Sequence, residues 1–417
     1  MKTTTTYQKV ASHEAHKGEF DKVLLLYSGG LDTSILLKWL QDHYDCEVIT
    51  LTIDIGQNEN LEAAKQKALN LGAKAAYIVD AKKDFAENFI SKAIKANADY
   101  QGGYHLFCPL GRAIISKVAV NIAHKENCQV IAHGCTGKGN DQVRFEGYIT
   151  TLDPKLKTIA PVREWAMGRD EQLEYAHKHG IPVSQTSQKI YSYDENLWGD
   201  SSEGGEIEDT SKIPNFKNCL IKCNTPENAP NKGEIVELEF LEGLPTHLNG
   251  KEYPLLELIK KLDPLGAKHA IGITTLIEDR IIGLKVRGVY EEPAAEIIIQ
   301  AHKNLEKLVS TREENEFKTI IDQKWAYLCY GAKWHHPLMD HLNSYIDSVN
   351  QKITGKVKIK LYKGKATVLA VESPNSLFDE KMATFMKNSL FNQNASAGFI
   401  ELWNLPQKTA YNIKHNG

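Results

Sequence analysis

The feature that most constrains the fold is an alternation of short apolar runs with amphipathic segments in the first half of the chain. Runs rich in Val, Ile and Leu lie at Lys22–Tyr27, Glu47–Ile53, Ala75–Val79 and Gln129–Ala132. Between these runs, apolar residues recur at helical spacing in Asn60–Leu71 and Arg112–Lys125. Strands that alternate with helices predict βαβ units, and therefore a parallel sheet covered by helices on both faces. Ligands of such sheets bind at the carboxyl ends of the strands.

The same alternation predicts further elements up to about residue 187. These are a strand at Ile159–Val162, a helix around Asp170–His179 and a strand at Ile181–Val183. Residues 188–231 are rich in Gly, Ser, Asn, Asp and Pro, which predicts a long, partly irregular connection. The sequence therefore predicts an α/β nucleotide-binding domain over residues 21–187, preceded by an extension at residues 1–20.

A second, α+β domain is predicted for residues 188–372. Strand patterns occupy Gly233–Phe240 and Leu248–Tyr253, the latter around an Asn249-Gly250 turn. A lysine-alternating hairpin turns at residues 363–365. Helical patterns occupy Leu255–Leu262, Ala294–Val309 and Leu338–Thr354. The segment 373–417 has low periodicity, and we expect it to form a C-terminal arm ordered by another subunit.

Charge and composition indicate which kinds of molecule the protein binds. The formal net charge is -3, whereas proteins that hold nucleic-acid phosphates usually carry a basic balance. The seven scattered cysteines are typical of reduced thiols in the cytosol rather than of a disulfide scaffold. No apolar run approaches the roughly 20 residues of a membrane span. We therefore expect a cytoplasmic protein that acts on small molecules, without nucleic-acid or membrane partners.

The segment Ser28-Gly29-Gly30-Leu31-Asp32-Thr33-Ser34 follows the first predicted strand and opens a helix. Its glycines let backbone N–H groups approach an anion, and its hydroxyls stand beside a helix N-terminus, which favours phosphate. Asp32 would repel a bare phosphate, so it suits a site in which Mg²⁺ bridges the carboxylate to the ligand. The alternative is a purely structural turn in which Asp32 or Thr33 caps the helix.

A second polar segment, residues 133–146, follows another predicted strand at the same sheet edge. Its three glycines let the backbone pass close to a ligand. A hydroxyl, a cation, an amide, a carboxylate and a guanidinium follow one another at Thr136, Lys138, Asn140, Asp141 and Arg144. An amino-acid substrate needs such a mixture, because it carries both an ammonium and a carboxylate group. The alternative is a polar turn that leads into a helix.

The first segment resembles the PP-loop of the ATP pyrophosphatase superfamily, and longer motifs narrow the resemblance to argininosuccinate synthetase. The similarity runs in register from about Lys22 to at least Asn404. The motifs that carry it are YSGGLDTS (27–34), HGCTGKGNDQVRFE (133–146), YSYDENLWG (191–199), IEDRIIGLKVRGVYEEPA (277–294), SPNSL (373–377) and GFIELW (398–403). The resemblance implies condensation of citrulline with aspartate, driven by cleavage of ATP to AMP and pyrophosphate through a citrullyl-adenylate. It also implies a homotetramer whose C-terminal arms embrace neighbouring subunits.

The resemblance further implies which residues bind each substrate. ATP would contact Leu26, Tyr27, Ser28, Gly29, Gly30, Leu31, Asp32, Thr33, Ser34, Ile53 and Gly134. Aspartate would contact Thr136, Asn140 and Asp141. Citrulline would contact Tyr104, Asn140, Arg144, Ser192, Ser201, Glu278 and Tyr290. Asp32, as the metal contact, and Asp141 are the predicted catalytic residues; the proton acceptor is either Asp141 or the phosphate of the adenylate.

The sequence departs from the family pattern at two places, a three-residue segment and a single residue. Two other functions also stay open. Phe107-Cys108-Pro109 stands where the family commonly has Gly-Thr-Ser, whose serine contacts citrulline, and Ile273 replaces an arginine. One alternative function is a tRNA-thiolating PP-loop enzyme with Cys108 and Cys135 as sulfur carriers. The other is a non-catalytic nucleotide-binding regulator.

Overall fold

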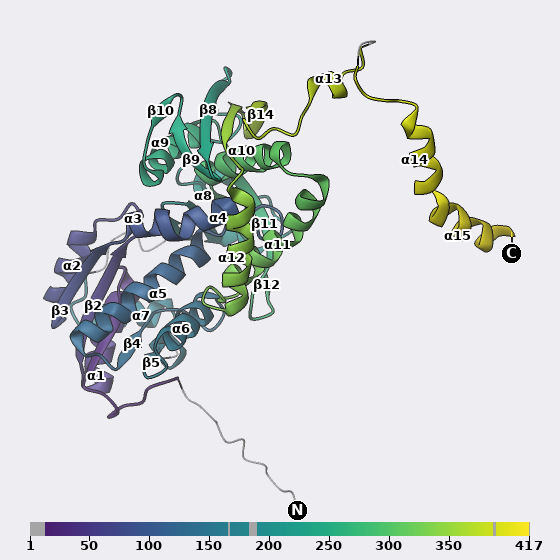
Figure 1. Ribbon diagram of the computed structural model, residues 1–417. Coiled ribbons are helices and arrows are strands. Elements are labelled where there is room, and N and C mark those ends of the chain that lie inside the picture. The colour runs from purple at the N-terminus through teal and green to yellow at the C-terminus, as the bar shows by residue number, and fades with distance from the viewer. Residues whose placement is uncertain (1–12, 166, 183–189, 387–388, 417) are drawn as a thin grey trace, which may run out of the picture.

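The computed structural model describes residues 13–165, 167–182, 190–386 and 389–416. Its first domain contains a five-stranded parallel sheet in the order β3-β2-β1-β4-β5 (Figure 1). The strands are β1 (Lys22–Leu26), β2 (Glu47–Asp54), β3 (Ala75–Asp80), β4 (Val130–Ala132) and β5 (Lys157–Ile159). The four strands predicted first are confirmed. The strand predicted at Ile159–Val162 ends at Ile159, because Pro161 begins the short 3₁₀ helix η2 (Pro161–Arg163). Ile181 lies in no strand, and Val183 lies outside the described residues.

Helices cover both faces of this sheet, as predicted. They are α1 (Leu31–Tyr44), α2 (Leu61–Asn70), α3 (Lys82–Phe85), the π-helical turn η1 (Ala86–Ile90), α4 (Ser91–Lys95), α5 (Phe107–Glu126), α6 (Asp141–Leu152) and α7 (Arg169–Lys178). Because side chains of a strand alternate between faces, Val23 and Leu25 of β1 pack in one apolar cluster with α1, α2 and α7. Leu24 packs in the other cluster, which includes α5.

The predicted irregular connection at residues 188–231 contains regular structure, which corrects the prediction. Residues 188 and 189 lie outside the described part, but β6 (Tyr191–Asn196) and β7 (Gly199–Gly204) form a hairpin. This hairpin joins β11 (Ile273–Asp279) and β12 (Lys285–Glu291) in an antiparallel sheet of order β11-β12-β7-β6. The short helices η3 (Gly205–Glu208) and α8 (Phe216–Cys219) follow the hairpin. The strands have an unusual polar composition because several of their side chains line the site described below.

A third sheet, also antiparallel, has the order β10-β9-β8-β13-β14. Its strands are β8 (Glu234–Leu241), β9 (Leu244–Leu248), β10 (Lys251–Glu252), β13 (Gly355–Tyr362) and β14 (Lys365–Glu372). The predicted Asn249-Gly250 turn is confirmed, with φ of 53° and 76° at its two residues. Helices α9 (Leu255–Lys268), α10 (Pro293–Val309), α11 (Arg312–Tyr330) and α12 (Pro337–Asn350) complete this domain.

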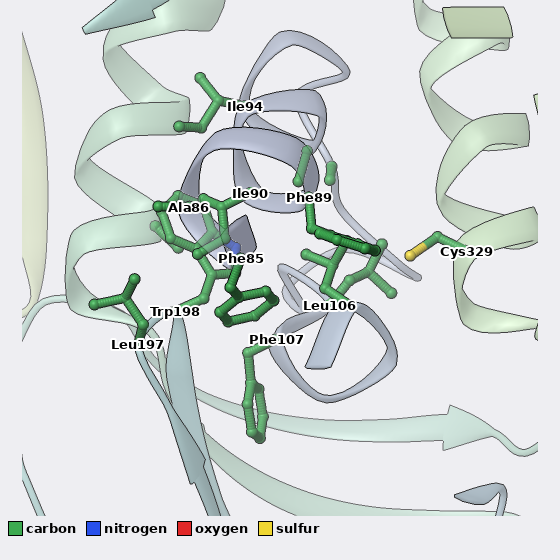
Figure 2. Close-up of a cluster of buried hydrophobic side chains, with 14 of the residues drawn as sticks. Phe85, Ala86, Phe89, Ile90, Ile94, Leu106, Phe107, Leu197, Trp198 and Cys329 are labelled. Atoms are coloured by element: carbon green, nitrogen blue, oxygen red, sulfur yellow. The ribbon is translucent and has the colours of Figure 1, made fainter. Parts of the chain in front are cut away.

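A continuous apolar core joins the two domains and fixes how their polar edges face each other. Figure 2 shows its centre, where Phe85, the last residue of α3, lies near Phe107 at the start of α5 and near Trp198, and where Phe89 of η1 packs in the same cluster. Trp198 follows β6 and is fully buried, and its indole N–H donates to the carbonyl of His105 at 3.0 Å. The loop before α5 is therefore anchored to the β6–β7 hairpin of the second domain.

The chain beyond β14 reaches away from the body of the molecule (Figure 1). It contains α13 (Glu380–Ala383), α14 (Ala395–Trp403) and α15 (Leu405–Asn416), in a segment for which the low periodicity led to no prediction of secondary structure. Large apolar side chains on this arm are exposed, among them Phe399 and Trp403 at 60% and 62%. Helix α14 is largely apolar and α15 is mixed, and neither has a buried face, so their pattern lacks the periodicity that packing against the chain's own core would impose.

Candidate active site

The connection between β1 and α1 is built for close approach of a ligand to the backbone. Gly29 has φ of 80°, and a Cβ there would lie 2.6 Å from the Cβ of Ala64, so another residue would be both strained and obstructed. The hydroxyl oxygens of Ser28 and Thr33 lie 3.2 Å apart at this turn. Because Leu31 begins α1, the unpaired N–H groups of the first helical turn lie next to these hydroxyls.

A cavity of about 760 Å³ opens over this connection, and we call it the nucleotide cavity. The predicted ATP contacts that line it are Leu26, Tyr27, Ser28, Gly30, Asp32, Thr33, Ile53 and Gly134. Three others, Gly29, Leu31 and Ser34, are not among its lining residues. The Ser34 hydroxyl is buried and donates to the Gly30 carbonyl at 2.7 Å, so this side chain stabilises the helix start and does not face the cavity.

Asp32 lies in the first turn of α1, with its side chain at the nucleotide cavity. Within the ranges that the structure describes, no group of three or more His, Cys, Asp or Glu side chains is arranged to hold a metal ion. The donor set therefore fits a cation only if a ligand supplies most of its coordinating oxygens, as is usual for Mg²⁺ with phosphates.

A second cavity of about 380 Å³ adjoins the first, and we call it the amino-acid cavity. It is lined by every residue predicted to contact aspartate or citrulline: Tyr104, Thr136, Asn140, Asp141, Arg144, Ser192, Ser201, Glu278 and Tyr290. They come from the segment before α5, the β4–α6 connection, the first turn of α6, the β6–β7 hairpin and the β11–β12 pair. Segments that lie more than a hundred residues apart in the sequence therefore line the same amino-acid cavity.

Asp141 is the centre of an ion-pair cluster in the amino-acid cavity. Its Oδ2 accepts from Arg112 Nε at 2.9 Å, and its Oδ1 accepts from Arg144 Nη1 at 3.0 Å. Arg112 also donates to Asp194 at 2.7 Å. Burial by itself would raise the pKa of the Asp141 carboxyl, but the two guanidinium groups outweigh it and hold this pKa well below its usual range. Asp141 is therefore ionised and poorly suited to accept a proton.

Glu278, almost fully buried, is held by two phenols. Its Oε1 accepts from Tyr290 at 2.8 Å, and its Oε2 accepts from Tyr330 at 2.7 Å. Asn140 Nδ2 donates to the same Tyr330 oxygen at 2.8 Å. The position of the carboxylate is thus set before any substrate arrives.

The β11–β12 connection is tied to the glycine-rich segment that follows β4. Arg280 donates to the carbonyl of Lys138 at 3.1 Å and pairs with Glu203 at 2.8 Å. Burial raises the pKa of Glu203, although the adjacent Arg280 partly offsets it. Both side chains line the amino-acid cavity, so this contact closes one of its walls.

His133 holds the N-terminal end of the glycine-rich segment in place. Its Nδ1 accepts from the backbone N–H of Cys135 at 3.3 Å, which leaves Nε2 to donate to Glu146 at 3.2 Å. Arg163 pairs with the same Glu146 oxygen at 2.7 Å. Burial would raise the pKa of Glu146, yet the bond to His133 and the pair with Arg163 lower it to about 2.

The two cavities share a wall. The residues that line both are Arg112, Gly134, Cys135, Asp141, Ser192, Tyr193 and Asp194. A group bound in one cavity can therefore reach a group bound in the other, with a cation, Arg112, at the junction.

Several of these residues were not predicted from the sequence. Asp194 lies inside the motif at residues 191–199 but was not assigned a role, and Arg112 directly follows the segment that departs from the family pattern. The alternation of Ser192 with Asp194 is a two-residue strand period that was interpreted as a loop. Tyr330 carries no such signal. Of the residues that depart from the family pattern, Cys108 lines the amino-acid cavity, whereas neither Pro109 nor Ile273 does.

Comparison with known proteins matches both halves of the chain. Residues 22–182 match the arginosuccinate synthase N-terminal HUP domain, and residues 191–410 match the arginosuccinate synthase C-terminal domain. The chain belongs to the argininosuccinate synthase family. Argininosuccinate synthase of Pyrococcus furiosus is 48% identical over 94% of this chain and 95% of its own length. The Oceanobacillus iheyensis protein of that name is 46% identical over 93% and 92%, respectively.

These matches confirm the predicted family and the parallel-sheet nucleotide-binding fold of the first domain. Because they extend through the second domain, they favour an argininosuccinate synthase over a tRNA-thiolating enzyme. A solved U34-tRNA thiolase from Methanococcus maripaludis shares 19% identity, with a TM-score of 0.28 over 40% of this chain and 59% of its own, which carries no argument about activity. Among the described residues, no helix combines the length and the apolar character needed to cross a membrane.

Proposed function

We propose that this chain condenses citrulline with aspartate to form argininosuccinate, with cleavage of ATP to AMP and pyrophosphate. The observation that carries the proposal is the wall shared by the two cavities. The nucleotide cavity contains a helix N-terminus suited to phosphate, and the amino-acid cavity contains paired acidic and basic side chains. A reaction that joins a nucleotide phosphate to an amino acid needs this adjacency, since reacting atoms must come within about 3–3.5 Å of each other.

In this proposal citrulline lies in the amino-acid cavity with its ammonium at Glu278 and its carboxylate at Arg144. The rings of Tyr104 and Tyr290, whose centroids lie 4.5 Å apart, together form an apolar wall of this cavity. The neutral ureido group then meets hydroxyls, which both donate and accept hydrogen bonds. Those hydroxyls belong to Ser192, Ser201 and Tyr290.

Aspartate would bind at the β4–α6 connection, through Thr136, Asn140 and Asp141. The carboxylate of Asp141 already accepts bonds from two guanidinium groups, and a carboxylate has about four lone-pair sites. It can accept one more bond, from the amine of aspartate. Its lowered pKa argues against the predicted role as proton acceptor, so we assign the amine proton to the phosphate of the adenylate.

ATP would bind with its pyrophosphate at the start of α1 and its α-phosphate at the shared wall. The ureido oxygen attacks the α-phosphorus, and pyrophosphate leaves; the aspartate amine then attacks the ureido carbon, and AMP leaves. Arg112 lies where negative charge develops in the first step. Mg²⁺ would enter with the nucleotide, held by phosphate oxygens and by Asp32, and would neutralise the departing pyrophosphate.

The proposal includes a homotetramer in the cytoplasm, joined through the C-terminal arm at residues 373–417. It is supported by the exposed apolar side chains of α14 and α15, which need a partner surface, and by free thiols at all seven cysteines. We keep the proposed divisions at residues 21–187 and 188–372, with an extension at 1–20 of which residues 1–12 lie outside the described part.

The substrate dependence of pyrophosphate release tests the proposal. Purified protein with Mg-ATP should release pyrophosphate only when citrulline is present, and argininosuccinate should form only when aspartate is added. A regulator that only binds ATP would release no pyrophosphate, and a tRNA-thiolating enzyme would require tRNA. Preparations that bind ATP but show no citrulline-dependent release would contradict the proposed function.

A further inference from the structure

The hydroxyl of Tyr330 lies in a buried polar network behind the amino-acid cavity. Tyr330 is the last residue of α11, is 2% exposed and is absent from the residues that line the cavity. Its oxygen accepts from Asn140 Nδ2 at 2.8 Å while it donates to Glu278 Oε2 at 2.7 Å. One hydroxyl therefore joins two side chains that come from different domains and face the substrate space.

The ring of Tyr330 is fixed by contacts that do not involve its hydroxyl. It stacks on Tyr100 with the centroids 3.7 Å apart and the planes 7° from parallel. The guanidinium of Arg144 lies over the same ring, 4.9 Å from its centroid. Replacement by phenylalanine keeps these contacts and removes only the hydroxyl, which makes the hydroxyl separately testable.

Tyr290 offers an internal comparison. Its hydroxyl donates to the other oxygen of Glu278 at 2.8 Å and forms no hydrogen bond with Asn140. The Oδ1 of Asn140 accepts instead from the backbone N–H of Ile281 at 2.9 Å. Thus Tyr290 orients Glu278, whereas Tyr330 orients both Glu278 and Asn140.

We propose that Tyr330 is a positioning residue that couples the two amino-acid sites of this enzyme. Its hydroxyl holds Glu278 ready for the citrulline ammonium and holds Asn140 ready for aspartate as well as citrulline. The inference rests on the proposed assignment of Glu278 and Asn140 to these substrates. Without the hydroxyl, the Asn140 amide loses the acceptor of its Nδ2 and is held only at Oδ1 by Ile281, and Glu278 loses one of its two phenol donors.

The test compares Tyr330→Phe with Tyr290→Phe, and uses Tyr327→Phe as a matched control. Tyr327 lies on the same helix, is 58% exposed and has no hydrogen bond to the site residues named above. Steady-state kinetics give KM for citrulline and for aspartate, calorimetry gives Kd for ATP, and thermal unfolding gives Tm. We expect Tyr330→Phe to raise both amino-acid KM values about tenfold, which is the usual size for a lost bond to a charged or buried group. The Kd for ATP should stay within about twofold of wild type, because Tyr330 does not line the nucleotide cavity.

We expect Tyr290→Phe to raise the citrulline KM alone, and Tyr327→Phe to change neither value. The proposal is overturned if Tyr330→Phe leaves the aspartate KM unchanged. It is equally overturned if the variant loses ATP binding or folding together with substrate affinity, because that result would show a general structural role. Failure of the wild-type protein to make argininosuccinate would contradict the proposed function, whereas these outcomes concern only Tyr330.

Discussion

Replacement of Asp141 by asparagine separates the two half-reactions. The change keeps the shape of the side chain and removes the charge that holds Arg112 and Arg144. Under our proposal the aspartate amine loses a charge-assisted hydrogen bond, of about 1.5–3 kcal/mol, so the aspartate KM should rise about 10–100-fold. Citrulline-dependent adenylate formation, measured as exchange of labelled pyrophosphate into ATP without aspartate, should survive.

The same substitution has a cost in stability that follows from the ion pairs. Removing one member of a buried pair costs about 3–5 kcal/mol, but the Asp141 side chain keeps 27% of its exposure and Arg112 keeps its bond to Asp194. We therefore expect the free energy of unfolding to fall by about 2 kcal/mol at pH 7. The folded-state pKa of Asp141 is lowered, so its stabilisation is present above the unfolded pKa of about 4 and is lost as the pH falls towards the folded value. The difference between wild type and variant should narrow in acid.

Asp194→Asn serves as the matched control, because it removes the other partner of Arg112 and leaves Asp141 intact. This control should keep the aspartate KM near that of wild type. The reasoning would be refuted if Asp141→Asn abolished ATP binding while the aspartate dependence stayed unchanged.

Four further predictions concern the nucleotide loop, the residues that depart from the family pattern, and the arm. Asp32→Asn should weaken binding of Mg-ATP more than binding of adenosine in calorimetry; equal losses would assign Asp32 only a structural role in the first turn of α1. Gly29→Ala should lower the free energy of unfolding by about 2 kcal/mol or more, because it adds left-handed strain to a clash with Ala64; an unchanged denaturation midpoint would contradict this. Pro109→Ser should leave the citrulline KM within about twofold of wild type, since Pro109 does not line the cavity, and a lower KM would show that the serine contact matters here. Deletion of residues 373–417 should reduce the molecular mass in sedimentation from that of a tetramer, with ATP binding retained; an intact tetramer would exclude the arm as the joining element.

The sequence was sufficient to predict the parallel sheet and its first four strands because their signals are local. Val, Ile and Leu runs mark strands that are buried on both faces, and the two glycine-containing segments mark the strand ends where ligands bind. The substrate contacts followed from long motifs, and all of the predicted amino-acid contacts line one cavity. The sequence shows where each motif lies along the chain, but it does not show that the motifs come together around one cavity in the folded structure.

The hairpin β6–β7 shows why other parts could not be predicted. Ser192 and Asp194 have low intrinsic strand preference, and they occupy a strand because their neighbours pair with β7 and their side chains face a polar cavity. Helix α11 did carry a readable signal, since Thr311 and Glu314 form a capping box. Tyr330, at the other end of that helix, meets Glu278 only through the tertiary fold, and no local pattern announces the contact.

The common wall of the two cavities has a consequence for inhibitor design. A single molecule that carries a nucleotide phosphate and an amino acid on a short linker would occupy both spaces at once. Its second half would bind at the high effective concentration that the linker sets, so its affinity would exceed that of either half. Because Arg112 and Asp194 lie on this wall, a linker with an anionic centre and an adjacent hydrogen-bond donor would match what the protein already presents there.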